Sequence, residues 1–152
     1  MIALRAATAT DLDDILPRTR ALNDHEGITI ATPQLRAALE KLLGDRSLGG
    51  VWVIEDAAQP ATTATTIGYA IVTFGFDLEF GGRDAWLTEL WVDESARGRG
   101  AGTTALALLE PELRALDVKA YHLQVREQNP ALRLYERAGF ARVPRLILTR
   151  RL

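Results

Sequence analysis

The sequence has no cysteine, one methionine and only two histidines. The lack of cysteine excludes disulfides, thiolate metal sites and a cysteine nucleophile, and it is compatible with a reducing cytoplasm. Histidine, aspartate and glutamate do not cluster at metal-ligand spacing along the chain. We therefore expect no bound metal.

Long apolar runs and an excess of one charge are also missing. No stretch approaches the roughly 18 apolar residues of a membrane span, and the segment Met1–Arg5 lacks the basic and apolar regions of a signal peptide. The 18 basic and 20 acidic residues give a net charge of -2, and the basic residues are spread along the chain. We expect a cytoplasmic protein that contacts neither a membrane nor nucleic acid.

Length and composition predict a single domain over residues 1–152. The chain is 47% hydrophobic and 25% charged, which is typical of a soluble globular protein. Apolar periodicity predicts a mixed α+β fold in the order βααβββαβαβ. The expected elements are a strand at 2–5, helices at 10–23 and 32–44, strands at 51–56, 67–76 and 85–92, a helix at 102–116, a strand at 121–125, a helix at 130–138 and a last strand near the C-terminus.

Glycine and proline punctuate these elements. A turn-forming loop is expected at 57–65, and Gly81-Gly82 allows the strands at 67–76 and 85–92 to form an antiparallel hairpin. Pro111 lies inside the helix expected at 102–116, where a proline costs roughly 3 kcal/mol. We expect a kink there instead of a continuous helix.

A glycine-rich segment, Arg97-Gly98-Arg99-Gly100-Ala101-Gly102-Thr103, lies where a predicted strand gives way to a helix. A helix N-terminus attracts anions, and the glycines let a phosphate approach the backbone. Arg97 and Arg99 can add charge-assisted hydrogen bonds, while Thr103 can contact phosphate or cap the helix. The spacing G-x-G-x-G fits neither a P-loop nor a dinucleotide fingerprint. Taken alone, the segment is equally compatible with a solvated turn.

Two segments together resemble the GNAT superfamily of acyl-coenzyme A N-acyltransferases. Residues 92–102 are similar to its pyrophosphate-binding motif Q/R-x-x-G-x-G/A, with Arg97, Gly100 and Gly102 on the fixed positions. Residues 129–140 are similar to its second motif, N-x-x-A-x-x-L-Y-x-x-x-G-F. Asn129 lies one residue closer to Tyr135 than the motif specifies, so both Gln128 and Asn129 are candidates for the polar position.

The resemblance covers nearly the whole chain and implies a fold and ligands. The implied fold is a mixed, largely antiparallel sheet that splays between its fourth and fifth strands and is flanked by about four helices. The implied ligands are acetyl-coenzyme A and an amine acceptor, and a homodimer is expected because the superfamily often forms dimers. The implied coenzyme-binding residues are Trp91, Val92, Arg97, Gly98, Arg99, Gly100, Ala101, Gly102, Thr103 and Asn129.

Glu89 and Tyr135 are the candidate catalytic residues. Glu89 alternates with Leu87 and Trp91 on one strand face, where burial would raise its pKa toward that of a general base for an ammonium substrate. The alternative for Glu89 is an exposed or salt-bridged carboxylate. The family position of Tyr135 implies that its hydroxyl protonates the leaving thiolate, and the alternative is a tyrosine packed in the core.

The predicted reaction is acetyl transfer by direct attack in a ternary complex. We expect the acceptor to be a primary amine of a small molecule such as a polyamine, an amino acid or an aminoglycoside-like compound. Protein N-termini or lysines are the alternative acceptors, and a non-catalytic acyl-coenzyme A sensor is the alternative class. His25 and Glu26 are expected in a loop where they line the acceptor site or are solvated. Asp77 and Glu79 on the hairpin attract a cationic amine or are likewise solvated.

Overall fold

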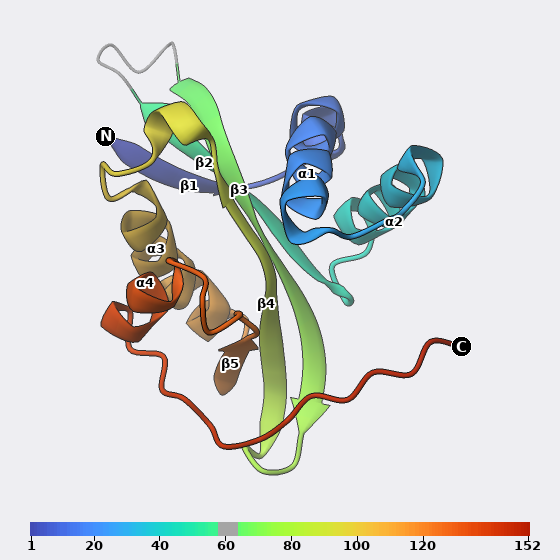
Figure 1. Ribbon diagram of the computed structural model, residues 1–152, viewed down its shortest axis with the longest axis vertical. Coiled ribbons are helices and arrows are strands. Elements are labelled where there is room, and N and C mark those ends of the chain that lie inside the picture. The colour runs from blue at the N-terminus through green and yellow to red at the C-terminus, as the bar shows by residue number, and fades with distance from the viewer. Residues whose placement is uncertain (58–63) are drawn as a thin grey trace.

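A five-stranded sheet forms the centre of the molecule in the computed structural model, which describes residues 1–57 and 64–152 (Figure 1). Its strands lie side by side in chain order: β1 Ile2–Ala6, β2 Gly49–Ala57, β3 Ala64–Asp77, β4 Gly82–Val92 and β5 Ala120–Leu123. The first four strands pair antiparallel, whereas β4 and β5 pair in parallel. Of the loop expected at 57–65, only its ends are described, and they belong to β2 and β3.

Helices cover both faces of this sheet. Helices α1 Leu12–Glu26 and α2 Thr32–Gly44 lie on one face, and α3 Ala101–Ala115 and α4 Leu132–Arg137 lie on the other (Figure 1). Single 3-10 turns, η1 Ala9–Asp11 and η3 Glu94–Ala96, precede α1 and α3. The predicted α+β class and the order of elements through α4 are confirmed.

The apolar run of β3 is buried on both of its faces. Tyr69 and Ile71 pack under α1 and α2, while the alternate residues Ala70 and Val72 pack under α3. Successive side chains of a strand point to opposite faces, so a central strand that is covered twice needs apolar residues at nearly every position. The two-sided burial holds β3 and its neighbour β4 as a rigid support for the groups described below.

Two expectations about regular structure are wrong. Helix α3 continues through Pro111 without interruption, because Leu106, Leu109 and Leu113 are buried against the sheet and this packing overrides local propensity. The last strand does not form, and residues 140–152 have no regular secondary structure. Pro144 removes a backbone donor there, and within the described ranges no strand pairs with this segment.

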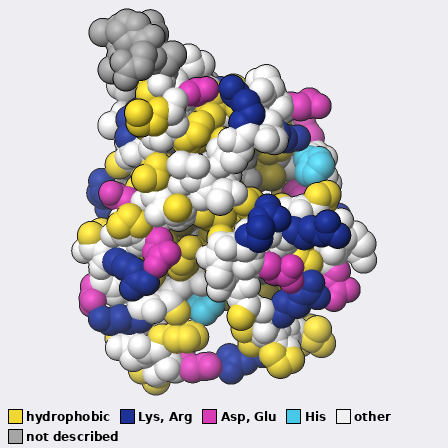
Figure 2. Space-filling view, turned by 90° about the vertical axis from the view of Figure 1, so that its left-hand side faces the viewer, with side chains coloured by type: hydrophobic (Ala, Val, Ile, Leu, Met, Phe, Trp, Pro, Cys, Tyr) yellow, Lys and Arg dark blue, Asp and Glu magenta, His cyan; other side chains and the backbone are white. Residues whose placement is uncertain are grey.

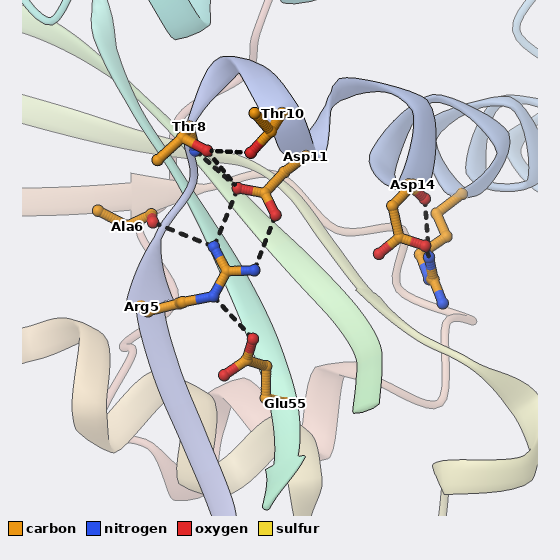
Figure 3. Close-up of polar contacts among 8 residues, drawn as sticks. Arg5, Ala6, Thr8, Thr10, Asp11, Asp14 and Glu55 are labelled. Atoms are coloured by element: carbon orange, nitrogen blue, oxygen red, sulfur yellow. Dashed lines mark hydrogen bonds and ion pairs between the residues drawn. The ribbon is translucent and has the colours of Figure 1, made fainter. Parts of the chain in front are cut away.

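Arg5 fastens the sheet to the start of α1. Its guanidinium holds Glu55 Oε1 through Nε at 2.7 Å and both carboxylate oxygens of Asp11 at 2.7 and 2.9 Å (Figure 3). The Thr8 backbone N–H donates to the same Asp11 carboxylate at 2.7 Å. Hydrogen bonding from Arg5, supported by Thr8, lowers the pKa of Asp11 to about 2.

The stability that the Arg5–Asp11 contact contributes should depend on pH. The native pKa of Asp11 lies below its ordinary value, so its stabilisation is complete above about pH 4 and is lost as the pH falls to about 2. We expect Asp11→Asn to lower the free energy of unfolding at neutral pH by about 1–2 kcal/mol, since Arg5 is partly solvent-screened. Urea titrations at neutral pH and at about pH 2.5 measure the difference between the two proteins. A difference that does not shrink in acid would contradict the assignment.

Candidate functional site

Strands β4 and β5 part after a short paired stretch. Their register runs from Asp84 opposite Ala120 to Leu87 opposite Leu123, and β4 then continues to Val92 without β5 beside it. At the same level the register of β4 with β3 jumps, so that Thr88 is an extra residue in β4. A bulge bends a strand and increases its twist, which turns the remainder of β4 away from β5. The predicted splay between the fourth and fifth strands is confirmed.

Glu89 is the first residue of β4 beyond this bulge. It lies opposite Ile71 on the face covered by α1 and α2, and its Oε2 accepts a hydrogen bond of 2.6 Å from the Tyr69 hydroxyl. Burial raises the pKa of Glu89 above its ordinary value, and the hydrogen bond from Tyr69 opposes part of that rise. The result is a half-buried carboxylate that takes up a proton more readily than a solvated one.

Tyr69 keeps its own proton. Its side chain is completely buried, and burial together with the charge of Glu89 raises its pKa far above the ordinary value. Tyr69 therefore acts as a permanent hydrogen-bond donor that orients the carboxylate. Sequence reasoning missed this residue, because Tyr69 and Glu89 lie on different strands and their pairing depends on the bulged register. The one sequence signal was that Tyr69 and Ile71 alternate along β3, which places Tyr69 on the same face of the sheet as the residue opposite Glu89.

The glycine-rich loop leads from the end of β4 into α3. Gly98 and Gly100 have φ angles of +74° and +79°, and a Cβ on either would meet no atom within 4 Å. These positions require glycine and face open space. Gly100 caps α3, and the first helical hydrogen bond runs from Thr104 N to Gly100 O at 2.9 Å. The N–H groups ahead of Thr104 are therefore left directed out of the helix start.

The other predicted loop residues take different positions around this helix start. Ala101, the first residue of α3, is buried, whereas Thr103 is exposed in the first turn. Arg97 donates from Nε to Val92 O at 2.9 Å, and its guanidinium lies over the Trp91 ring with 4.8 Å to the centroid. Arg97 thereby braces the loop against the end of β4.

Arg99 is the less restrained of the two loop arginines. One of its guanidinium nitrogens lies 3.6 Å from Asp56 Oδ2 at the end of β2, and its side chain is 59% exposed. At this distance and exposure the ion pair is weak. Arg99 is therefore free to turn toward an anion at the start of α3.

Helix α4 packs onto the start of α3 and brings the two motifs together. A Cβ on Gly102 would lie 3.4 Å from a methyl carbon of Leu134, in ordinary van der Waals contact, so the two helices pack closely at this point. Asn129 Oδ1 accepts a 2.9 Å hydrogen bond from Ala131 N and so orders the turn before α4. The side chain of Asn129 has a structural role in the turn in addition to any contact with coenzyme.

Tyr135 lies on α4 against the core beneath α3. Its ring meets Phe140 edge-on at 5.9 Å between centroids. Burial, and then the charge of Glu26, raise the pKa of the Tyr135 hydroxyl. The hydroxyl is consequently protonated at neutral pH, and a carboxylate of α1 lies within electrostatic reach of it.

Glu26 belongs to the last turn of α1, so the expectation that His25 and Glu26 lie in a loop is wrong. Helix α1 ends at Gly27, whose φ of +68° supplies the left-handed cap. Arg126, in the segment after β5, donates to Glu26 O at 2.9 Å and lies 3.5 Å from its carboxylate. This contact joins the end of α1 to the segment that follows β5.

Asp93 fixes the point at which β4 enters the loop. Its carboxylate receives three hydrogen bonds of 2.8 to 3.1 Å from Arg18 of α1 and one of 3.0 Å from Trp91 Nε1. Arg18 also donates to Thr66 O at 3.1 Å and to Asp14 O at 2.7 Å. Sequence reasoning missed this support, because Arg18 and Asp93 lie 75 positions apart and nothing in their local patterns links them.

The hairpin carboxylates are occupied by other partners. Glu79 forms an ion pair with Arg145 at 2.9 Å, and Asp77 accepts a 2.8 Å bond from the Glu79 backbone N–H.

A surface hollow of about 620 Å³ lies over the outer side of α4, and neither Glu89 nor Tyr135 borders it. Asn129 does border this hollow. Neither catalytic candidate therefore belongs to this hollow.

The described residues also bear on metal binding, membrane spanning and surface charge. Among residues 1–57 and 64–152 there is no group of three or more histidine and acidic residues placed to hold a metal ion. None of the described helices is long and apolar enough to cross a membrane. Basic and acidic side chains are intermixed on the face shown in Figure 2.

Comparison with known proteins identifies relatives of this arrangement. The family model of the acetyltransferase (GNAT) family matches residues 19–140. An integron cassette protein from the mobile metagenome of Cole Harbour Salt Marsh is 26% identical, with a TM-score of 0.83 over 98% of this chain and 90% of its own. No curated protein sequence matches the chain.

Two further solved structures share the fold. A possible acetyltransferase from Clostridium difficile 630 is 18% identical with a TM-score of 0.83, over 100% of this chain and 98% of its own. A predicted acetyltransferase from Clostridium acetobutylicum, solved with acetyl-CoA, is 21% identical with a TM-score of 0.75, over 99% of this chain and 96% of its own.

Proposed function

The chain belongs to the acetyltransferase (GNAT) family, and we propose that it transfers an acetyl group from acetyl-coenzyme A to a primary amine. One observation carries the proposal: Glu89, a carboxylate with a raised pKa, lies where β4 leaves β5. Acceptor and thioester would meet at this point in a ternary complex. A small-molecule amine is the proposed acceptor class.

The start of α3 is the proposed pyrophosphate site. The residues present fit two linked phosphates, because Gly98 and Gly100 leave open space where any other side chain would stand. The N–H groups of the first helical turn and the side chains of Arg97 and Arg99 supply the donors. The C. acetobutylicum neighbour, solved with acetyl-CoA, supports this ligand.

Three groups of the chain would carry out the transfer. Glu89 removes the proton of the acceptor ammonium, whose ordinary pKa of about 10.4 otherwise keeps it unreactive at neutral pH. Backbone N–H groups at the open edge of β4 stabilise negative charge on the thioester oxygen. The protonated hydroxyl of Tyr135 donates to the leaving sulfur.

The charge around the parted strands favours a cationic acceptor. Glu89 lies on the side of the sheet that carries α1, and Glu26 closes the end of that helix within electrostatic reach of Tyr135. Two carboxylates from different elements would thus flank an ammonium group that approaches from the α1 side. A small amine could be held by these two carboxylates alone and would need no additional binding surface on this protein.

Thiol release tests the proposal. Purified protein is mixed with acetyl-coenzyme A and panels of polyamines, amino acids, aminoglycosides and peptides, and free thiol is followed. We expect turnover with a subset of the small amines. Turnover with peptides alone would replace the proposed acceptor with a protein terminus or lysine. Coenzyme binding with no turnover in any panel would indicate a sensor, and no calorimetric signal at millimolar acyl-coenzyme A would overturn the function altogether.

Tyr135→Phe is expected to lower kcat by about 10²-fold, because it removes the donor to the leaving sulfur. The phenylalanine ring preserves the packing on Phe140, so the Kd for acetyl-coenzyme A should not change. Tyr121→Phe is a matched control, since Tyr121 packs on the same ring at 4.7 Å. Equal losses in the two variants would show that the Tyr135 hydroxyl has only a structural role.

A further inference from the structure

A second carboxylate is buried at the hairpin end of β4, away from Glu89. The Asp84 side chain is only 9% exposed, and in the described part of the chain no hydrogen bond joins its carboxylate to another group. His122 of β5 is the closest candidate partner, and its Nε2 lies 3.8 Å from Asp84 Oδ2, beyond hydrogen-bond distance. Buried carboxylates are normally hydrogen-bonded or paired, because burial without a partner is costly. Asp84 can therefore accept a donor that the described residues do not supply.

The backbone of β3 leaves room for this carboxylate. Asp84 lies opposite Gly75 in the sheet, and a Cβ on Gly75 would come within 2.6 Å of Asp84 Oδ1. Any other residue at position 75 would displace the carboxylate, because non-bonded contacts to carbon are optimal at roughly 3.5–4.0 Å. The glycine thus keeps a place in which Oδ1 lies over β3 and Oδ2 faces His122.

Three aromatic rings are grouped beside Asp84. The His122 ring contacts those of Phe80 and Trp86, with centroid distances of 5.3 and 5.1 Å. Phe80 is 40% exposed, and Trp86 and His122 are partly buried. Aromatic faces attract cations, and apolar surfaces of this kind pack against methylene groups. A carboxylate beside such rings suits an alkylammonium group, whose charge meets the oxygen while its alkyl chain covers the rings.

Asp84 and Glu89 share one face of the sheet, with Trp86 between them. All three lie opposite alternate residues of β3, because the bulge at Thr88 shifts Glu89 onto the face of Asp84 and Trp86. Glu89 follows Asp84 by five positions, one of them taken up by the bulge, so their Cα atoms are about 13–16 Å apart. This face of β4 therefore presents a carboxylate, an aromatic ring and a second carboxylate in succession.

We propose that Asp84 binds a second ammonium group of the acceptor, so that the preferred substrate is a linear diamine whose alkyl chain crosses Trp86. This assignment rests on the proposed acetyl transfer at Glu89 and defines the acceptor more closely. A diamine supplies the partner that Asp84 lacks, whereas a monoamine leaves the carboxylate unpaired. The pairing is strengthened because Asp84 is largely shielded from water. The distal charge is remote from the reacting amine and therefore acts on acceptor binding.

Two amines that differ in one group test this subsite. Diaminooctane and octylamine have the same alkyl chain, but only diaminooctane has an ammonium group at the far end. Thiol release with acetyl-coenzyme A should give a KM for diaminooctane about 10–100-fold lower than that for octylamine, with similar kcat values. Asp84→Asn should raise the KM for diaminooctane to nearly that of octylamine. Equal KM values in the wild type would overturn the proposal, as would an unchanged ratio in Asp84→Asn.

Asp117→Asn is the matched control. It also removes one carboxylate, but from an 81% exposed side chain in the turn before β5, where φ is 59° and asparagine is tolerated. This variant should keep the full preference for diaminooctane. The comparison of the two amines in the wild type involves no substitution, so it decides the question even if Asp84→Asn does not fold.

Calorimetry with coenzyme A bound separates this subsite from the proposed reaction, because it gives the Kd of each amine whether or not acetyl transfer takes place. Tight binding of diaminooctane that is lost in Asp84→Asn, without thiol release, would contradict the proposed reaction and support the subsite. Turnover of both amines with equal KM and Kd values would support the reaction and overturn the subsite.

Discussion

Replacement of Glu89 by glutamine should lower kcat by about 10²–10⁴-fold while the Kd for acetyl-coenzyme A stays unchanged. Glutamine has nearly the shape of glutamate, and its carbonyl oxygen can still accept the hydrogen bond from Tyr69. Only the ability to take up a proton is lost. Thiol-release kinetics and calorimetry separate the two quantities, and unchanged turnover would remove Glu89 from the role of base.

Tyr69→Phe is the companion variant for this prediction. The hydrogen bond from Tyr69 holds the pKa of Glu89 below the value that burial alone would produce, so its removal raises that pKa further. A base acts in its deprotonated form, so the acidic limb of the kcat profile should move to higher pH. A purely structural role for Tyr69 would lower activity equally at every pH and leave the limb in place.

Gly100→Glu is expected to weaken acetyl-coenzyme A binding by about 100-fold or more. The variant places a side chain and a negative charge in the open space at the N-terminus of α3, where phosphate is expected to bind. Calorimetry and thermal shift with acetyl-coenzyme A measure the loss. Binding that equals that of the wild type would refute the assignment of this loop to the pyrophosphate.

Backbone strain must be separated from charge at this position. Gly100 has a φ of +79°, so any side chain strains the turn. Gly100→Ala introduces the strain without the charge and should weaken binding far less. Gly81→Glu is a matched control on the hairpin, where φ is +70° and a Cβ likewise meets nothing within 4 Å. It should lower thermal stability by a similar amount and leave coenzyme binding intact.

Much of the fold follows from patterns that are local in the sequence. The order of elements through α4, the glycine loop at the start of α3 and the hairpin between β3 and β4 were all predicted. Each depends on residues within one or two turns of the chain, such as Gly100 at the cap of α3 and Gly81 in the turn. Local conformational preference is sufficient to place such features.

The last strand and the helix end at Glu26 were not predicted correctly for the opposite reason. Residues 143–149 have strand composition, but a strand forms only where tertiary packing brings the segment against a sheet edge, and none of the described strands pairs with these residues. Helix α1 extends to Glu26 because Gly27 supplies the left-handed cap and Arg126, from a distant segment, binds the Glu26 carbonyl. Gly27 was a local signal for this helix end, whereas the contact from Arg126 cannot be recognised from the neighbouring residues.

The family resemblance, the element order and the choice of Glu89 and Tyr135 as candidates all followed from the amino-acid sequence. The surroundings of these residues depend on tertiary packing, which supplies the donor Tyr69, the hydrogen bonds from Arg18 to Asp93, and the approach of Glu26 to Tyr135. Secondary structure and turn chemistry depend on neighbours along the chain, whereas a pKa depends on burial and on charges that strand register and helix packing bring together.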